Sequence, residues 1–190
     1  MFYDKSLSVN NTISCASCHK QAFAFSDTAL VSKGVEGGIS VRHAMRLVNA
    51  RFSNELKFFW NERAANLEIQ TTMPIQDHSE MGFSGTNGRG NINSLVNKLS
   101  GINYYKEIFK TVYGDTTVTE IRLQESLAQF IRSIQSFDAK YDAENRQPLD
   151  YELKVTTQDG IDGESKQQIV KVNEPLTFGS TRVYLQANGY

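Results

Sequence analysis

The sequence lacks a strong excess of charge and any long apolar run. Its 190 residues carry a formal net charge of -1 at pH 7, so no basic surface is indicated that would bind nucleic acid. A bilayer-spanning helix needs about 20 consecutive apolar residues, and no segment approaches that length, so we expect no membrane span in this chain. The first residues, Met1 to Lys5, also lack the charged and apolar regions of a secretion signal.

Cysteine and histidine are both scarce. The chain has two cysteines, Cys15 and Cys18, and three histidines. A zinc site would need a second pair of ligands, and His43 and His78 are not spaced as such a pair. A structural disulfide between the two cysteines and a CxxC redox pair remain open, although no strand precedes the motif as it would in a redox βαβ unit.

The stretch from Ser14 to His19 reads SCASCH and matches the c-type haem attachment signature. In such sites two thiols add to the haem vinyl groups and the following imidazole ligates the iron. Residues three apart share a face of a helical turn, so Cys15 and Cys18 can reach one porphyrin edge while His19 meets the metal. We therefore expect one covalent haem c, held by Cys15 and Cys18, with His19 as the metal ligand. Such attachment is normally made outside the cytoplasm, so we expect a periplasmic protein whose signal peptide is absent from this chain.

Apolar spacing predicts a mainly α-helical fold over most of the chain. The clearest pattern predicts a helix over about 118–137, with a buried stripe that includes Ile121, Leu127 and Ile131. Further helices are predicted at about 44–52, 64–72, 91–99 and 103–113, with Pro74 ending or deflecting the second of them. Glycines in residues 28–40 predict a loop that folds over one face of the haem.

The character of the chain changes after Tyr141. Residues 142–150 are polar and contain Pro148, as in a linker. Three β-type runs follow, at 151–156, 168–172 and 181–186, with Asp-Gly turns between the first two. We predict a helical haem domain over residues 1–146 and a small β-rich segment over residues 147–190.

Four stretches of the first part carry a family pattern. They read ISCASCH at 13–19, RHAMRLVNARF at 42–52, FFWNERAANLE at 58–68 and MPIQDHSEMG at 73–82. Together they resemble the N-terminal haem domain of bacterial di-haem cytochrome c peroxidases, a family that includes MauG-like proteins. The resemblance covers about residues 1–146 and implies a cytochrome c-like helical domain. It also implies that hydrogen peroxide is reduced to water at this haem, with electrons that a small cytochrome c or cupredoxin delivers to a second haem.

The resemblance implies roles for three more residues. Glu80 matches the distal acid-base carboxylate, Gln70 matches a distal glutamine, and Trp60 matches a tryptophan that relays electrons between the haems. The chemistry favours Glu80 independently, because cleavage of a peroxide O–O bond needs a proton moved from the inner to the outer oxygen. A carboxylate beside an open iron position can move that proton.

The sequence departs from the family pattern in two places. His43 stands where relatives commonly carry an asparagine that helps to bind calcium, which argues against a calcium site. No second CxxCH is present, so Trp60 has no second haem in this sequence from which to relay electrons. Residues 148–190 instead resemble the soluble region of ResB-type cytochrome c biogenesis proteins, through DYELKVTTQDG and VNEPLTFGSTRVYLQANGY.

The sequence thus predicts a c-type haem peroxidase module that reduces hydrogen peroxide and is impaired by the absence of the second haem domain. Two alternatives stay open. One is a single-haem electron-transfer cytochrome c without catalysis, and the other is a haem-handling protein of cytochrome c maturation.

Overall fold

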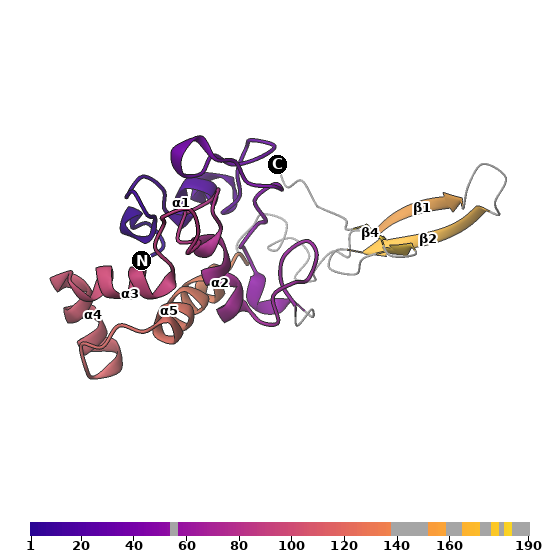
Figure 1. Ribbon diagram of the computed structural model, residues 1–190. Coiled ribbons are helices and arrows are strands. Elements are labelled where there is room, and N and C mark those ends of the chain that lie inside the picture. The colour runs from indigo at the N-terminus through magenta and orange to yellow at the C-terminus, as the bar shows by residue number, and fades with distance from the viewer. Residues whose placement is uncertain (54–56, 138–151, 159–164, 172–175, 179–180, 184–190) are drawn as a thin grey trace. The chain divides into compact units, whose positions relative to one another are not determined.

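The computed structural model describes residues 1–53 and 57–137, together with the backbone of four strands between residues 152 and 183. The chain divides into two units (Figure 1). Unit 1 comprises Met1–Phe52 and Leu56–Gln135, and unit 2 comprises Ser53–Glu55 and Ser136–Tyr190. The predicted domain boundary at residues 146 and 147 lies outside the described residues, so this division of the chain stays a prediction.

Unit 1 is built from helices joined by long loops (Figure 1). The α-helices of its described part are α1 (Cys15–Cys18), α2 (Leu67–Gln76), α3 (Ile92–Ser100), α4 (Asn103–Tyr113) and α5 (Glu120–Ser133). Short 3₁₀ turns cover Lys5–Leu7, Gln21–Phe23, Val35–Gly37 and Ala50–Phe52. The described residues of unit 1 contain isolated β-bridges but no strand, so the predicted mainly helical fold is confirmed.

Local sequence signals explain where these helices begin and end. The side chain of Asn91 accepts a hydrogen bond from the backbone N–H of Asn93 at the start of α3. The Thr119 hydroxyl accepts one from the N–H of Arg122 at the start of α5. These bonds satisfy N–H groups that the first helical turn leaves unpaired. At the end of α4, Gly114 has a left-handed φ of 85°, which glycine adopts without a steric penalty.

The core of unit 1 lies where α3, α4 and α5 pack together. Its fully buried side chains include Leu95, Leu99, Tyr105, Phe109 and Leu123. Helix α2 packs against α5, and an ion pair of 2.6 Å joins Glu68 on α2 to Arg132 on α5. These helices form the frame on which the N-terminal loops lie.

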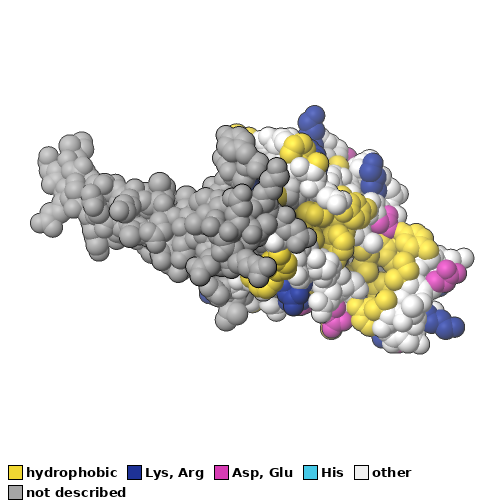
Figure 2. All heavy atoms as spheres, turned by 180° about the vertical axis from the view of Figure 1, so that it is seen from behind, with side chains coloured by type: hydrophobic (Ala, Val, Ile, Leu, Met, Phe, Trp, Pro, Cys, Tyr) yellow, Lys and Arg dark blue, Asp and Glu magenta, His cyan; other side chains and the backbone are white. Residues whose placement is uncertain are grey.

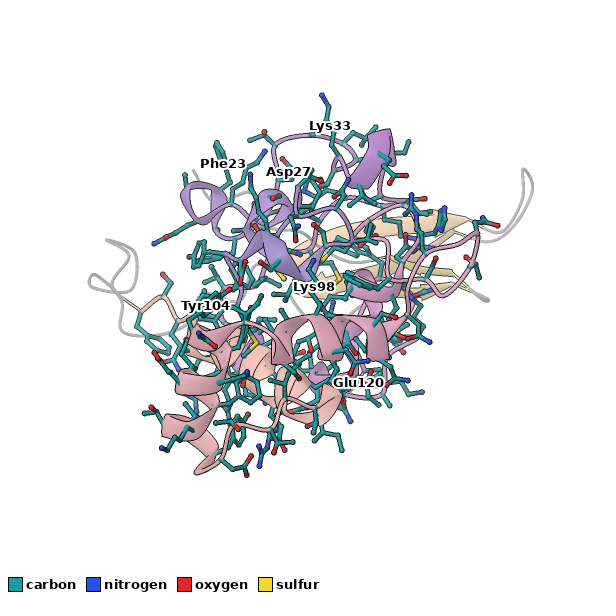
Figure 3. All side chains as sticks on the ribbon, turned by 60° about the vertical axis from the view of Figure 1, so that its left-hand side comes forward. Phe23, Asp27, Lys33, Lys98, Tyr104 and Glu120 are labelled. Atoms are coloured by element: carbon teal, nitrogen blue, oxygen red, sulfur yellow. The ribbon has the colours of Figure 1, made fainter. Side chains whose placement is uncertain are left out.

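Polar contacts tie the N-terminal segment to α3 and α4. Lys98, which Figure 3 shows on α3, donates a hydrogen bond of 2.9 Å from Nζ to the carbonyl of Ser8. The Asp4 carboxylate accepts hydrogen bonds from the hydroxyls of Tyr104 and Tyr105. Burial, followed by the bond to Asp4, raises the pKa of Tyr105 far above its ordinary value. The segment that carries the CxxCH motif is therefore anchored to the helical frame from its N-terminal side.

The predicted helix over residues 44–52 is wrong. In this stretch only Ala50–Phe52 form a 3₁₀ turn, and Asn49 has a left-handed φ of 62°. The backbone N–H of Asn49 donates to the carbonyl of Ile134, at 2.9 Å. Apolar spacing of three and four residues also arises in a loop that presents side chains to a cavity, and periodicity alone does not separate the two cases.

Helix α5 is shorter than the predicted span of 118–137, and its buried face is different at the N-terminal end. Leu127 and Ile131 are buried as predicted, but Ile121 is 66% exposed and Leu123 is fully buried instead. Val112 on α4 is similarly exposed. Figure 2 shows that solvent-exposed hydrophobic side chains gather on one face of the described part.

None of the helices in the described ranges is both long and apolar enough to span a bilayer. The longest of them, α5, has 14 residues, whereas a span needs about 20.

Unit 2 contains two short antiparallel hairpins among its described residues. Strand β1 (Glu152–Gln158) pairs with β2 (Ser165–Lys171), and β3 (Leu176–Phe178) pairs with β4 (Thr181–Val183). The other residues between 147 and 190 lie outside the described part, as do all side chains of this segment. The small β-rich segment over residues 147–190 therefore stays a prediction.

Candidate functional site

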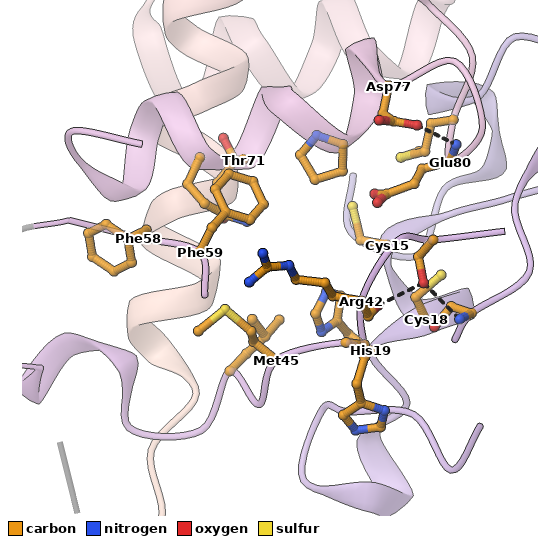
Figure 4. Close-up of a pocket in the computed structure, with 18 of the residues that line it drawn as sticks. Cys15, Cys18, His19, Arg42, Met45, Phe58, Phe59, Thr71, Asp77 and Glu80 are labelled. Carbon is orange, nitrogen blue, oxygen red and sulfur yellow. Dashed lines mark hydrogen bonds between the residues drawn. The ribbon is translucent and has the colours of Figure 1, made fainter. Parts of the chain in front are cut away.

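A cavity of about 470 Å³ lies within unit 1. Its wall is formed by the CxxCH turn, by the loops at residues 32–34, 40–47 and 58–63, by α2 with residues 77–81, and by two side chains of α5 (Figure 4). This volume is in the range of protein sites that enclose small ligands and cofactors.

All six predicted site residues line this one cavity, although they come from four separate segments. They are Cys15, Cys18, His19, Trp60, Gln70 and Glu80. The folding of the chain therefore brings together what the sequence holds up to 65 residues apart. Their proposed chemical roles remain predictions.

The CxxCH turn presents two thiols to the cavity. Cys15 and Cys18 begin and end α1, and neither forms a disulfide. Burial raises the pKa of Cys15 to about 12 and raises that of Cys18 as well, so both sulfurs carry a proton at neutral pH. The N–H of Ala16 donates to the carbonyl of Phe2 at 3.2 Å, which holds the turn against the N-terminal segment. The two thiols thus face one cavity from a single helical turn.

His19 follows the turn and is oriented by a backbone carbonyl. Its Nδ1 lies 3.0 Å from the carbonyl oxygen of Phe25, and a carbonyl can only accept, so Nδ1 carries the proton. Phe25 is brought back to His19 because Ala24 and Phe25 both have a left-handed φ of 55°. Burial lowers the pKa of His19, and hydrogen bonds from the ring to the carbonyls of Phe25 and Met45 act in the opposite direction. A metal-ligating histidine commonly donates one ring N–H to a backbone carbonyl in this way, and Phe25 supplies that acceptor for Nδ1.

The remaining wall of the cavity suits a haem. Apolar side chains dominate part of it, among them Phe2, Leu47, Phe58, Leu127 and Ile131. Four basic side chains also line it, namely Lys33, Arg42, Arg46 and Arg63. Haem is a flat apolar ring with two propionate carboxylates, and bound carboxylates are commonly paired with arginine or lysine. Two thiols, one imidazole, apolar walls and basic groups therefore form a set that fits a covalent haem.

Glu80 lies on a turn after α2 and faces the cavity (Figure 4). Burial raises its pKa to about 7, and the nearby negative charge of Asp77 adds to the increase, while Arg63 opposes it. A carboxyl group with this pKa can both accept and donate a proton near neutral pH. Glu80 is the one side chain of the predicted set with this property.

Trp60 and His43 are joined at another part of the wall. The indole N–H of Trp60 donates to the backbone carbonyl of His43 at 3.0 Å. Both ring nitrogens of His43 have hydrogen-bond partners, the carbonyl of Ala29 at 2.9 Å and the hydroxyl of Ser26 at 3.2 Å. The ring of His43 therefore ties Ser26 and Ala29 to this part of the wall.

The loop at 28–40 is fixed against the segment that carries Glu80. The N–H of Val35 donates to the carbonyl of Glu80 at 3.0 Å. Arg89 donates to the carbonyl of His78 and forms an ion pair of 2.6 Å with Glu36. The Arg89–Glu36 pair could not be predicted, because 53 residues separate its members and neither belongs to a motif.

Close packing at this junction explains a glycine of the loop. A Cβ atom added to Gly34 would overlap the carbonyl oxygen of Ser79 and approach Cα of Glu80 to 2.9 Å. Backbone atoms cannot move aside as a flexible side chain can, so the Gly34→Ala variant must shift the loop or the Glu80 segment. We expect the free energy of unfolding of this variant to be about 1–3 kcal/mol lower than that of wild type. The variant should therefore unfold at a lower denaturant concentration.

The matched control is Gly101→Ala at the end of α3. Gly101 has an ordinary φ of -78°, and its added Cβ would come no closer than 3.3 Å to another atom. Chemical denaturation followed by circular dichroism compares the two variants. Equal losses of stability would contradict the proposed clash.

The chain is similar to proteins of one known family. A family model described as di-haem cytochrome c peroxidase matches residues 1–148. The chain is 30% identical over 142 residues to methylamine utilization protein MauG of Methylophilus methylotrophus. The aligned region covers 75% of this chain and 40% of that protein. It is 28% identical over 164 residues to cytochrome c551 peroxidase of Nitrosomonas europaea, and this aligned region covers 86% of this chain and 45% of that protein.

A solved structure is also similar. The crystal structure of a MauG-like protein associated with microbial copper homeostasis matches with a TM-score of 0.64 and 30% identity, over 74% of this chain and 40% of that one. The chain thus spans less than half the length of these relatives. The family match ends at residue 148, and the predicted resemblance of residues 148–190 to ResB-type proteins finds no support in these comparisons.

Proposed function

The chain belongs to the di-haem cytochrome c peroxidase family, and from this premise we propose that its cavity holds a covalent haem and reduces hydrogen peroxide to water. The observation that carries the proposal is the presence of Glu80, with a pKa of about 7, in the same cavity as the CxxCH turn. An electron-transfer cytochrome needs the haem but has no use for such a proton-exchanging group.

The residues of the chain divide the work as follows. Cys15 and Cys18 would hold the haem through thioether bonds, and His19 would ligate its iron. The haem, when bound, would supply an iron that binds peroxide and provides electrons for cleavage of the O–O bond. Glu80 takes the proton from the inner peroxide oxygen and returns it to the outer one, so that the outer oxygen leaves as water. Gln70, which lines the same cavity, orients the peroxide oxygens by hydrogen bonding.

The finer parts of the function are also proposals. We propose that a small cytochrome c or a cupredoxin supplies the electrons, that Trp60 lies on their route, and that the protein works in the periplasm. With a single CxxCH in this sequence, we expect this chain by itself to turn over slowly with such protein donors. The basic side chains that line the cavity would pair with the haem propionates.

The proposal is tested with haem-loaded protein in a stopped-flow spectrometer. We expect the Soret band to change on mixing with hydrogen peroxide, at a rate that rises linearly with peroxide concentration. A ferric spectrum typical of methionine ligation, together with no response to peroxide, would instead identify a single-haem electron-transfer cytochrome.

A further inference from the structure

Asp77 organises the turn that carries Glu80. It is the residue that ends α2, and its Oδ1 accepts two backbone hydrogen bonds, from the N–H of Ser79 at 2.8 Å and from the N–H of Glu80 at 3.0 Å. Its backbone carbonyl accepts a third bond from the N–H of Gly82, at 2.8 Å. One residue therefore holds both ends of the 77–82 turn, with Glu80 inside it.

Asp77 also lines the cavity with Glu80, and Figure 4 shows the two side chains side by side with the bond to the Glu80 N–H. The two carboxyl groups repel each other when both are ionised. The other groups that act on the Glu80 carboxyl or face it are Arg63, whose positive charge acts in the opposite sense, and the Cys18 sulfur. Cys18 becomes an uncharged thioether once haem is attached, so among the described side chains Asp77 and Arg63 remain as the charges that act on Glu80, beside those of the haem iron and propionates.

Resting on the proposed function above, we propose that Asp77 is a positioning residue of the peroxide site. Its side chain fixes the backbone of Glu80, and its negative charge adds to the burial that favours the protonated form of the Glu80 carboxyl. A proton shuttle works best when it exchanges its proton near the working pH. Without the neighbouring charge, a larger fraction of Glu80 would be ionised at neutral pH and would return the proton to the outer oxygen less readily.

The two roles of Asp77 can be separated because asparagine retains one and loses the other. In the Asp77→Asn variant the side-chain oxygen can still accept the bonds from Ser79 and Glu80, but the charge is gone. The matched control is Glu36→Gln, which removes a carboxylate from the neighbouring loop whose charge is not among those that act on the Glu80 carboxyl. In haem-loaded protein, infrared titration of the protonated carboxyl band, assigned to Glu80 by its loss in Glu80→Gln, measures the titration midpoint directly.

We expect the Glu80 midpoint to fall by about one pH unit in Asp77→Asn, the size of effect that a nearby charge produces, and to stay unchanged in Glu36→Gln. The midpoint of the pH dependence of the peroxide reaction should fall by the same amount. An unchanged Glu80 midpoint in Asp77→Asn would overturn the proposal and leave Asp77 as a turn residue alone. The infrared titration needs no reaction, so it decides the role of Asp77 even if haem-loaded protein fails to react with peroxide, which would refute the proposed function.

Discussion

Replacement of both motif cysteines, Cys15→Ala with Cys18→Ala, is expected to abolish covalent haem attachment. Each attachment adds a thiol across a vinyl C=C, so that sulfur bonds to one carbon and the thiol hydrogen goes to the other. Alanine has no group that can do this. Both thiols are protonated at neutral pH, and they lie on one turn that lines the cavity, which is what the addition requires.

The measurement is denaturing gel electrophoresis with haem staining, together with extraction of the haem by acidified acetone. Wild-type protein matured in a host that attaches c-type haem should keep its haem under both treatments, while the double variant should lose essentially all of it. The single variants Cys15→Ala and Cys18→Ala should each retain one thioether. Haem that stays with the double variant after acid extraction would show that the motif is not the attachment site.

Replacement of the distal carboxylate, Glu80→Gln, is expected to slow the reaction with hydrogen peroxide by about 10²- to 10⁴-fold, the usual contribution of a general acid-base group. Glutamine keeps nearly the same size and a hydrogen-bonding oxygen but cannot exchange the proton. The second-order rate constant is read from the Soret change in a stopped-flow spectrometer between pH 5 and 9. A rate within threefold of wild type over this range would remove Glu80 from the mechanism.

A stability measurement distinguishes this effect from misfolding. The pKa of Glu80 is raised in the folded chain from an ordinary value of 4.5 to about 7, so its protonation favours the folded state. That contribution is complete below about pH 4.5 and is lost as the pH rises through about 7. Glutamine cannot titrate, so Glu80→Gln should remove this pH dependence, and at pH 8 the variant should be no less stable than wild type.

The sequence by itself determined the identity of the haem motif, because thioether chemistry needs two cysteines at one spacing and a histidine beside them. Helices α3 and α4 could also be predicted nearly to the residue, since each has a polar or glycine boundary and a clear apolar face. Residues 44–52 could not, because loop side chains that face a cavity imitate helical spacing. The apolar spacing predicts that Ile121 is buried, but it is exposed, and Leu123 is buried instead. The reason is related, since only packing against neighbouring helices decides which face of α5 is covered.

Only the tertiary structure decided how the site is assembled. The sequence singled out Glu80, but it said nothing of Asp77 or Arg63, whose charges act on the Glu80 carboxyl. An aspartate three residues before a glutamate is a common turn pattern, and its electrostatic effect depends on burial that no sequence pattern reports. The packing of Gly34 against Ser79 likewise joins segments 45 residues apart. Covalent haem attachment depends on residues that are neighbours in the sequence, so the sequence can reveal it. The proton affinity of a carboxyl group depends instead on the charges and burial that the folded chain places around it.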